Sequence, residues 1–145
     1  MEERCAGAPW KALLDRAQAA GADTEGEARE ALEEEAKAGI KRSAKEITDA
    51  AKRAGRRRRT EILDLGFERC AAWLRDLAAI ASGAEEVVFN RDRIERLRQQ
   101  ADGLDPAKAR RAAELVQETR RGLDLNVNEE LALEALFFRL ESLLA

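Results

Sequence analysis

Residues 61–82 read EILDLGFERCAAWLRDLAAIAS, and this stretch decides the fold of the chain. On a helical wheel at 100° per residue its apolar side chains form one broad face, whereas Asp64, Glu68 and Arg75 fall opposite. The apolar face holds Leu63, Phe67, Cys70, Trp73, Leu74, Leu77 and Ala81, flanked by Ile62 and Ile80. A face of this width predicts a core helix, and Gly83 is placed to end it.

Downstream of this helix, the sequence predicts a short link and a second helix. The link is the apolar run Val87-Val88-Phe89, which is too short to form a stable sheet by itself. Either Asn90 or Asp92 can cap the following helix, and Gly103 ends it.

Two more helices follow before the chain ends. Asp105-Pro106 is a capping residue followed by a proline suited to the first turn, so a helix is predicted from about 106 to 123. Asn126-Val127 is the predicted turn into the last helix, which Asn128 caps and whose first turn is acidic. The short connections favour antiparallel neighbours.

The first sixty residues are poor in large apolar side chains: 7 lie in residues 1–60 and 27 in residues 61–145. We predict a short helix over 9–20 that ends at Gly21, then a long charged helix over about 25–54. Thr24 and Glu27 have the spacing of a capping box for this long helix, and Gly55 ends or kinks it.

The whole chain is therefore expected to be all-α, a bundle of five to six helices. No window alternates apolar and polar residues over the length of a strand. We predict two regions: residues 1–60, a charged and partly extended or flexible segment, and residues 61–145, a compact helical core. The second region must supply most of the hydrophobic core.

Composition excludes several classes of function. The net charge of −3 argues against general attraction to nucleic acid, and two cysteines without histidine make no plausible zinc site. With no histidine there is also no obvious base for a nucleophile. We expect no catalytic residues, no cofactor, no metal, no small-molecule substrate and no membrane association, and a cytoplasmic location.

Four stretches of the second region, taken in order, carry a resemblance to a known family. They read AWLRDL at 72–77, VVFNRD at 87–92, TRRGLDLNVN at 119–128 and LALEAL at 131–136. Together they make this region resemble the C-terminal domain of the delta-prime subunit of the bacterial DNA polymerase III clamp loader. The basic run before residue 61 looks like the variable linking region found in some delta-prime subunits.

The resemblance implies a non-catalytic oligomerisation module. In such subunits this domain joins the C-terminal domains of the other loader subunits in a closed collar, and the assembly places the sliding clamp on DNA during replication. The expected partners are therefore other clamp-loader subunits. This chain has no phosphate-binding G-x-x-x-x-G-K-[ST] loop of its own.

The sharpest charge feature is Arg56-Arg57-Arg58-Arg59, within a segment (37–59) that holds ten basic and two acidic residues. One interpretation is phosphate contact, in a nucleic-acid-associated or self-associating helical protein. The other, which we favour, is a solvated helix face that pairs with the acidic run before it, because no aromatic residues interleave with the arginines.

On the last helix, Leu131 and Phe138 lie well off the main apolar arc. A second apolar patch is expected of a partner surface, so these two residues are candidate interface residues. They could instead pack under Trp10, Leu13 and Leu14 of the same chain, and the sequence does not decide between the two interpretations.

Overall fold

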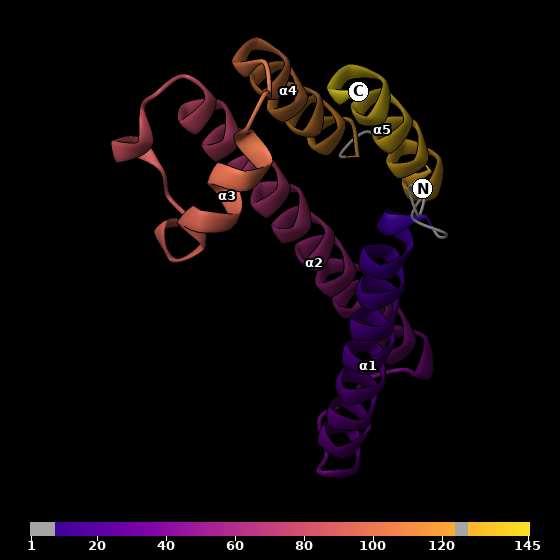
Figure 1. The fold of residues 1–145 in the computed structure, drawn as a ribbon. Coiled ribbons are helices and arrows are strands. Elements are labelled where there is room, and N and C mark those ends of the chain that lie inside the picture. The colour runs from indigo at the N-terminus through magenta and orange to yellow at the C-terminus, as the bar shows by residue number, and fades with distance from the viewer. Residues whose placement is uncertain (1–7, 124–127) are drawn as a thin grey trace. The chain divides into compact units, whose positions relative to one another are not determined.

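The computed structural model describes residues 8–123 and 128–145, and within these ranges every regular element is helical. Two single turns of 3-10 helix, η1 (Glu85–Val87) and η2 (Arg91–Arg93), accompany the α-helices. The five α-helices are α1 (Pro9–Lys37), α2 (Ala44–Ala81), α3 (Ile94–Ala101), α4 (Pro106–Leu123) and α5 (Glu129–Leu144) (Figure 1). The prediction of an all-α chain is confirmed; the turn predicted at Asn126-Val127 lies outside the described residues.

The chain separates into two compact units, Met1–Leu65 and Gly66–Ala145. Helix α2 contributes its first part to the first unit and its last part to the second. Each unit is described below by itself.

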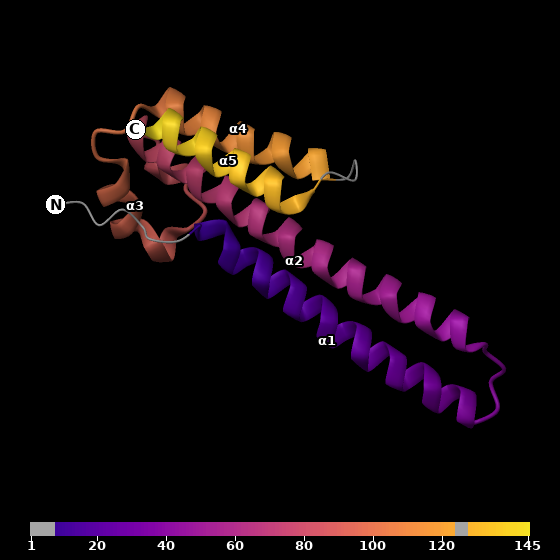
Figure 2. The ribbon, with the colours of Figure 1, turned by 90° about the vertical axis from the view of Figure 1, so that its right-hand side faces the viewer.

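The first unit is a helical hairpin, in which α1 and the first part of α2 lie side by side (Figures 1 and 2). The two backbones touch at a pair of glycines. A Cβ atom added at Gly21 would lie 2.9 Å from the carbonyl oxygen of Gly55, and one added at Gly55 would lie 2.7 Å from that of Gly21. Ala17 and Ala51, both fully buried, also keep the helices close. Gly21 and Gly55 therefore serve close packing, and neither ends a helix as predicted.

The helix boundaries predicted for the first unit are wrong. Thr24 lies inside α1, and the real break falls around Gly39, whose φ of +102° suits glycine. The capping box belongs instead to Ser43 and Glu46. The Glu46 amide donates to Ser43 Oγ at 3.2 Å, and the Ser43 amide donates to Glu46 Oε2 at 2.6 Å.

The second unit packs the last part of α2 with α3, α4 and α5, and Figure 2 shows α4 and α5 side by side. Its buried apolar residues include Phe67, Leu74, Leu77, Leu97, Leu115, Val116, Leu133, Leu136 and Leu140. Two predicted helix caps are confirmed: Asp105 Oδ1 accepts from the Ala107 amide at 2.7 Å, and Asn128 Oδ1 accepts from the Leu131 amide at 3.1 Å.

The predicted cap of the helix after Phe89 is wrong. Helix α3 begins at Ile94, directly after η2, and no side chain caps it. The Asn90 side chain is used elsewhere: its Nδ2 donates to Asp76 Oδ2 at 2.6 Å. The glycines predicted to end the neighbouring helices, Gly83 and Gly103, do adopt positive φ angles of +77° and +70°.

Candidate partner interface

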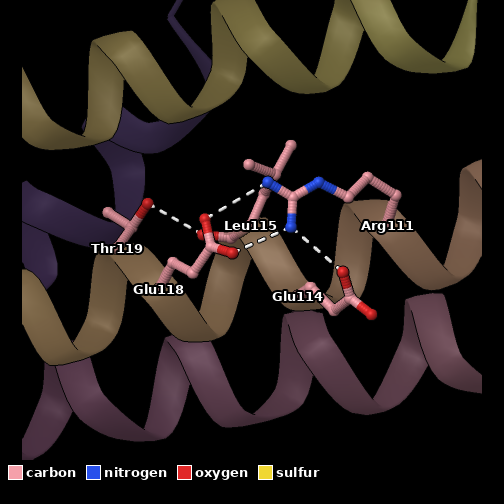
Figure 3. Close-up of polar contacts among 5 residues, drawn as sticks. All are labelled: Arg111, Glu114, Leu115, Glu118 and Thr119. Atoms are coloured by element: carbon pink, nitrogen blue, oxygen red, sulfur yellow. Dashed lines mark hydrogen bonds and ion pairs between the residues drawn. The ribbon is translucent and has the colours of Figure 1, made fainter.

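A row of charged side chains runs along the exposed side of α4, between α5 and α2 (Figure 3). Arg111 Nη1 donates to Glu114 Oε2 at 3.0 Å and to Glu118 Oε1 at 2.8 Å. The spacings of three and seven residues bring these groups onto one side of the helix. At the next residue after Glu118, Thr119 Oγ1 donates to the carbonyl oxygen of Leu115 at 2.9 Å.

These ion pairs persist at neutral pH. The hydrogen bond from Arg111 lowers the pKa of Glu118, and the nearby charges of Arg139 and Arg121 act in the same direction. The same carboxylate, with Glu114, raises the pKa of Arg111. All these groups are solvent-exposed, so the row contributes little to folding stability. What the hydrogen bonds do is hold the charged groups of Arg111, Glu114 and Glu118 in defined positions on this side of α4.

An open groove of about 1000 Å³ lies on one side of this charged row, between α2 and α4. Small side chains, including Ala72 and Ala113, line it alongside longer polar ones. Arg120 Nη2 of α4 reaches across to Glu68 Oε1 of α2 at 3.0 Å. The groove is thus lined in part by small alanine side chains and bordered by arginine and glutamate side chains.

An exposed aromatic side chain belongs to the lining of the groove. Phe89 is 69% exposed, although it follows the buried Val88. The Arg75 guanidinium carbon lies 3.8 Å from the centre of the Phe89 ring, a cation–π contact, and Arg75 Nη2 donates to the Val87 carbonyl oxygen at 3.0 Å. Arginine and aromatic side chains are among the types enriched at protein interfaces.

The position of Phe89 is set by a buried carboxylate. Asp76 of α2 is fully buried and accepts hydrogen bonds from the Phe89 amide at 3.1 Å and from the Asn90 amide at 2.9 Å. With its backbone held in this way, the Phe89 side chain remains at the surface. The stretches AWLRDL and VVFNRD, which are separate in the sequence, meet at this point.

Two further contacts hold the connection between α2 and α3. Arg98 of α3 binds both carboxylate oxygens of Glu85, at 2.9 and 2.5 Å, and its hydrogen bond lowers the pKa of Glu85. Trp73 of α2 donates from Nε1 to Gln100 Oε1 at 2.8 Å. One contact thus holds the chain at Glu85, before Phe89 in the sequence, and the other holds it at Gln100, after Phe89.

The two apolar candidates predicted on the last helix both lie at the surface. Leu131 is 61% and Phe138 is 73% exposed, and the buried Leu133, Leu136 and Leu140 share the same helix. A hollow of about 350 Å³ adjoins Phe138 and is lined by Arg111, Leu115, Phe138, Arg139, Ser142 and Leu143. The role of Leu131 and Phe138 as interface residues stays a prediction.

The four consecutive arginines lie on α2 within the first unit. Arg56, Arg57 and Arg58 are exposed and Arg59 is half-buried, and Arg58 Nη1 pairs with Glu61 Oε2 at 3.3 Å. The partner helix of the hairpin, α1, carries eight acidic and four basic residues. The basic part of α2 therefore lies beside an acidic helix.

Three further features bear on possible functional sites: the Cys70 thiol, groups of metal-binding side chains and membrane-spanning helices. Burial raises the pKa of the Cys70 thiol, which disfavours the reactive thiolate. In the part of the chain that the structure describes, no group of three or more histidine, cysteine, aspartate or glutamate residues could hold a metal ion. None of the described helices is long and apolar enough to cross a membrane. Cys5 lies outside the described residues.

Sequence reasoning alone does not find Asp76 or Phe89 as components of this surface. Asp76 lies off the apolar face of its helix, and its partners follow 13 and 14 residues later, so no local pattern signals the contact. The sequence pattern identifies Phe89 only as part of an apolar link. By contrast, Leu131 and Phe138 can be singled out, because they break a clear helical periodicity.

Comparison with protein families gives a match to part of the second unit. The family model described as "DNA polymerase III, delta subunit, C terminal" matches residues 67–142. That range contains the groove, Phe89, Asp76 and the exposed side of α5. Searches of curated proteins and of solved structures gave no significant match.

Proposed function

This chain belongs to the family of C-terminal domains of the DNA polymerase III delta subunit, and we propose that its second unit is a clamp-loader collar domain. Within that family we assign it to the delta-prime type, on the four stretches quoted above. Its function would be to hold its own subunit to the other clamp-loader subunits, in support of sliding-clamp loading in the cytoplasm during DNA replication.

The observation that carries this proposal is the exposure of Leu131 and Phe138 on α5. A large aromatic side chain that is mostly exposed, next to a hollow and a row of ion pairs, is typical of a surface that a partner covers. The groove beside α4, with Phe89 and Arg75 in its lining, adds a second such surface in the same unit.

The proposed role is one of binding and involves no chemical step by this chain. Holding subunits together requires complementary surfaces, and the second unit offers apolar side chains, arginines and glutamates fixed in place by its own hydrogen bonds. The proposal therefore assigns no cofactor and no substrate to the chain.

The test is reconstitution with the other clamp-loader subunits of the same organism, followed by gel filtration. The unmodified chain should co-elute with at least one of them, and Phe138→Ala should lose this while keeping its helical circular dichroism. Ile40→Ala is the matched control, because Ile40 is also an exposed apolar residue (50%) but lies between α1 and α2. Failure of the unmodified chain to bind any of these proteins would contradict the proposal.

A second candidate function, phosphate contact by Arg56–Arg59, is favoured by the exposure of Arg56, Arg57 and Arg58. Such binding would weaken steeply with salt, because bound cations release counterions from the phosphates. A gel-shift assay at low salt with primed and single-stranded DNA tests it. Absence of a shift for the unmodified chain would end this alternative.

A further inference from the structure

We propose that one face of the first unit binds the phosphate backbone of double-stranded nucleic acid, without preference for its sequence. This face, which we call the basic face, consists of Arg53, Arg56 and Arg57 of α2. The inference deepens the second candidate function and rests on it for the idea of phosphate contact. Two of the four consecutive arginines thus take part together with Arg53, and the ligand is a duplex.

The arginines of the basic face extend away from α1. Ala51 and Gly55 are buried where the two helices of the hairpin pack together. On the helical wheel, Arg53, Arg56 and Arg57 are offset from Ala51 by about 120–160°. All three are exposed. They therefore form one solvent-facing patch on α2, in which Arg53 and Arg57 are about 6 Å apart along the helix axis.

The register of the hairpin sets the acidic run of α1 beside an earlier part of α2. The two helices run antiparallel (Figure 2). A Cβ atom added at Gly55 would lie 3.0 Å from the Cβ atom of Glu25, and Arg42 Nη2 pairs with Glu35 Oε2 at 3.1 Å. The acidic run from Glu25 to Glu35 therefore lies alongside residues 42–55, although α1 as a whole faces the basic part of α2.

The arginines after Gly55 lie beside an uncharged part of α1. A Cβ atom added at Gly21 would lie 3.3 Å from the Cβ atom of Arg59, so residues 56–59 lie next to the part of α1 around Gly21. That part reads AQAAGA over 17–22 and holds no acidic residue. Glu30, in the middle of the acidic run, is nine residues further on, about 13 Å along the axis of α1. This exceeds the Debye length of about 10 Å at about 0.1 M salt, so the acidic run neutralises these arginines only weakly.

The basic face has no partner of its own for its charge. Among the described residues, no hydrogen bond or ion pair holds its three guanidinium groups, and Asp23, which follows the uncharged part of α1, makes no ion pair with them. The other two arginines of the run are engaged differently. Arg58 Nη1 pairs with Glu61 Oε2 at 3.3 Å, and Arg59 is half-buried beside α1. The basic face is therefore the part of the run that is available to an external anion.

The chemistry of this face suits the phosphates of a duplex. Residues 50–60 hold six basic residues and no acidic one, and arginine binds phosphate through paired hydrogen bonds. Proteins that bind single strands stack the bases on aromatic side chains, but the first unit has one aromatic residue, Trp10, and it is half-buried. A duplex keeps its bases paired and presents one charge per about 1.7 Å of its axis. Contacts to phosphates carry no sequence information, so no preferred sequence is expected.

Fluorescence anisotropy with the full chain and a labelled duplex of about 20 base pairs tests the proposal. Three phosphate contacts predict a slope of about −2.7 when the logarithm of the binding constant is plotted against that of the salt concentration. Arg56→Gln and Arg57→Gln should each reduce the size of this slope by about 1. At about 50 mM salt, each should weaken binding roughly 15-fold, which is the contribution of one released counterion relative to 1 M salt.

Two further variants serve as comparisons. Arg93→Gln is the matched control, because it removes the same charge from an exposed arginine of the second unit that already pairs with Asp92, and it should leave the slope unchanged. Arg58→Gln should weaken binding less than Arg56→Gln does, because Arg58 is already paired with Glu61. Circular dichroism checks that each variant keeps its helical content.

Two other ligands test the class of partner. A single strand of the same length should bind about sixfold more weakly than the duplex at about 50 mM salt, because its slope per contact is smaller, about −0.7 against −0.9. Polyglutamate, which stands for an acidic protein surface, should not displace the duplex. Tighter binding of the single strand, displacement by polyglutamate, or full binding by Arg56→Gln and Arg57→Gln would each overturn the inference.

The same measurements separate this inference from the functions proposed above. If Arg58→Gln abolishes binding while Arg56→Gln and Arg57→Gln do not, the basic face is wrong and phosphate contact by the arginine run stands. If the unmodified chain binds no duplex even at low salt, both are wrong. The collar role is tested separately by co-elution with other clamp-loader subunits, and neither result changes it.

Discussion

The most specific structural prediction concerns Asp76, the fully buried carboxylate that holds Phe89 and Asn90. Replacing Asp76 with alanine removes the acceptor from two backbone amides, which hydrogen-bond to it at 3.1 and 2.9 Å. Each buried donor that loses its acceptor costs about 1–3 kcal/mol, so the two together cost about 2–6 kcal/mol. We expect Asp76→Ala to lower the free energy of unfolding by roughly 4 kcal/mol, a large part of the roughly 5–15 kcal/mol of an ordinary domain.

Asp76→Asn should cost less than Asp76→Ala. It keeps the side-chain volume and one carbonyl acceptor, but it turns one oxygen into a donor that faces the donors of Asn90. Asp92→Asn is the control, because the Asp92 side chain is 77% exposed and pairs with its neighbour Arg93 at the surface. We expect this control to change stability by no more than about 0.5 kcal/mol.

Urea unfolding at pH 7, followed by tryptophan fluorescence and circular dichroism, measures these differences. Trp73 lies on the same helix as Asp76, so its fluorescence reports on this region once Trp10, the other tryptophan, is replaced by phenylalanine in every variant compared. A loss of less than about 1 kcal/mol for Asp76→Ala, or a loss equal to that of Asp92→Asn, would refute the argument that orphaned amides dominate.

Three further predictions follow from single contacts. Gly21→Ala should destabilise the chain, because the added Cβ would lie 2.9 Å from the carbonyl oxygen of Gly55. Gly26→Ala is the contrast: its added Cβ would meet no atom within 4 Å, so it should raise the free energy of unfolding, measured in urea, by about 0.5–1 kcal/mol. Folding lowers the pKa of Glu85, so its pair with Arg98 stabilises the folded chain at pH values above the unfolded pKa near 4.5, and this stabilisation is lost as the pH falls through the lower folded pKa. In Glu85→Gln, the free energy of unfolding should no longer contain this pH-dependent contribution. An unchanged dependence of unfolding on acid pH would count against the prediction. Burial raises the pKa of Cys70, so in a Cys5→Ser variant, where Cys70 is the one thiol left, the folded chain should react with a thiol reagent at about pH 8 far more slowly than the urea-unfolded chain. Equal rates would contradict this.

The second unit could largely be predicted from the sequence because its local signals agree with its packing. Phe67, Leu74 and Leu77 of the predicted apolar stripe are buried, and the caps at Asp105 and Asn128 and the glycines at 83 and 103 lie where the pattern places them. Periodicity and capping act within a few residues, so a single sequence reveals them.

The first unit could not be predicted as well, because its glycines serve tertiary packing. Gly21 and Gly55 look like helix ends in the sequence, yet they allow two helix backbones to touch. The real break at Gly39 and the capping box at Ser43 carry signals of the same kind and strength. Only the packing of α1 on α2 distinguishes a glycine that ends a helix from one that lies within it.

Part of the candidate interface could likewise be predicted from the sequence, and part of it could not. Leu131 and Phe138 could be predicted as unusual because they oppose the periodicity of their own helix. The groove and Phe89 could not, since they depend on α2, α4 and the Asp76 contact coming together in space.

Photo-crosslinking within a reconstituted clamp loader tests the central claim, that the second unit binds neighbouring subunits, most directly. A photoreactive amino acid is placed in turn at Phe138, at Phe89 and at the control position Ile40, all of which are exposed. The account predicts adducts to another clamp-loader protein from Phe138 and Phe89 and none from Ile40. Adducts from Ile40 alone, or none from any position in an assembled complex, would contradict it.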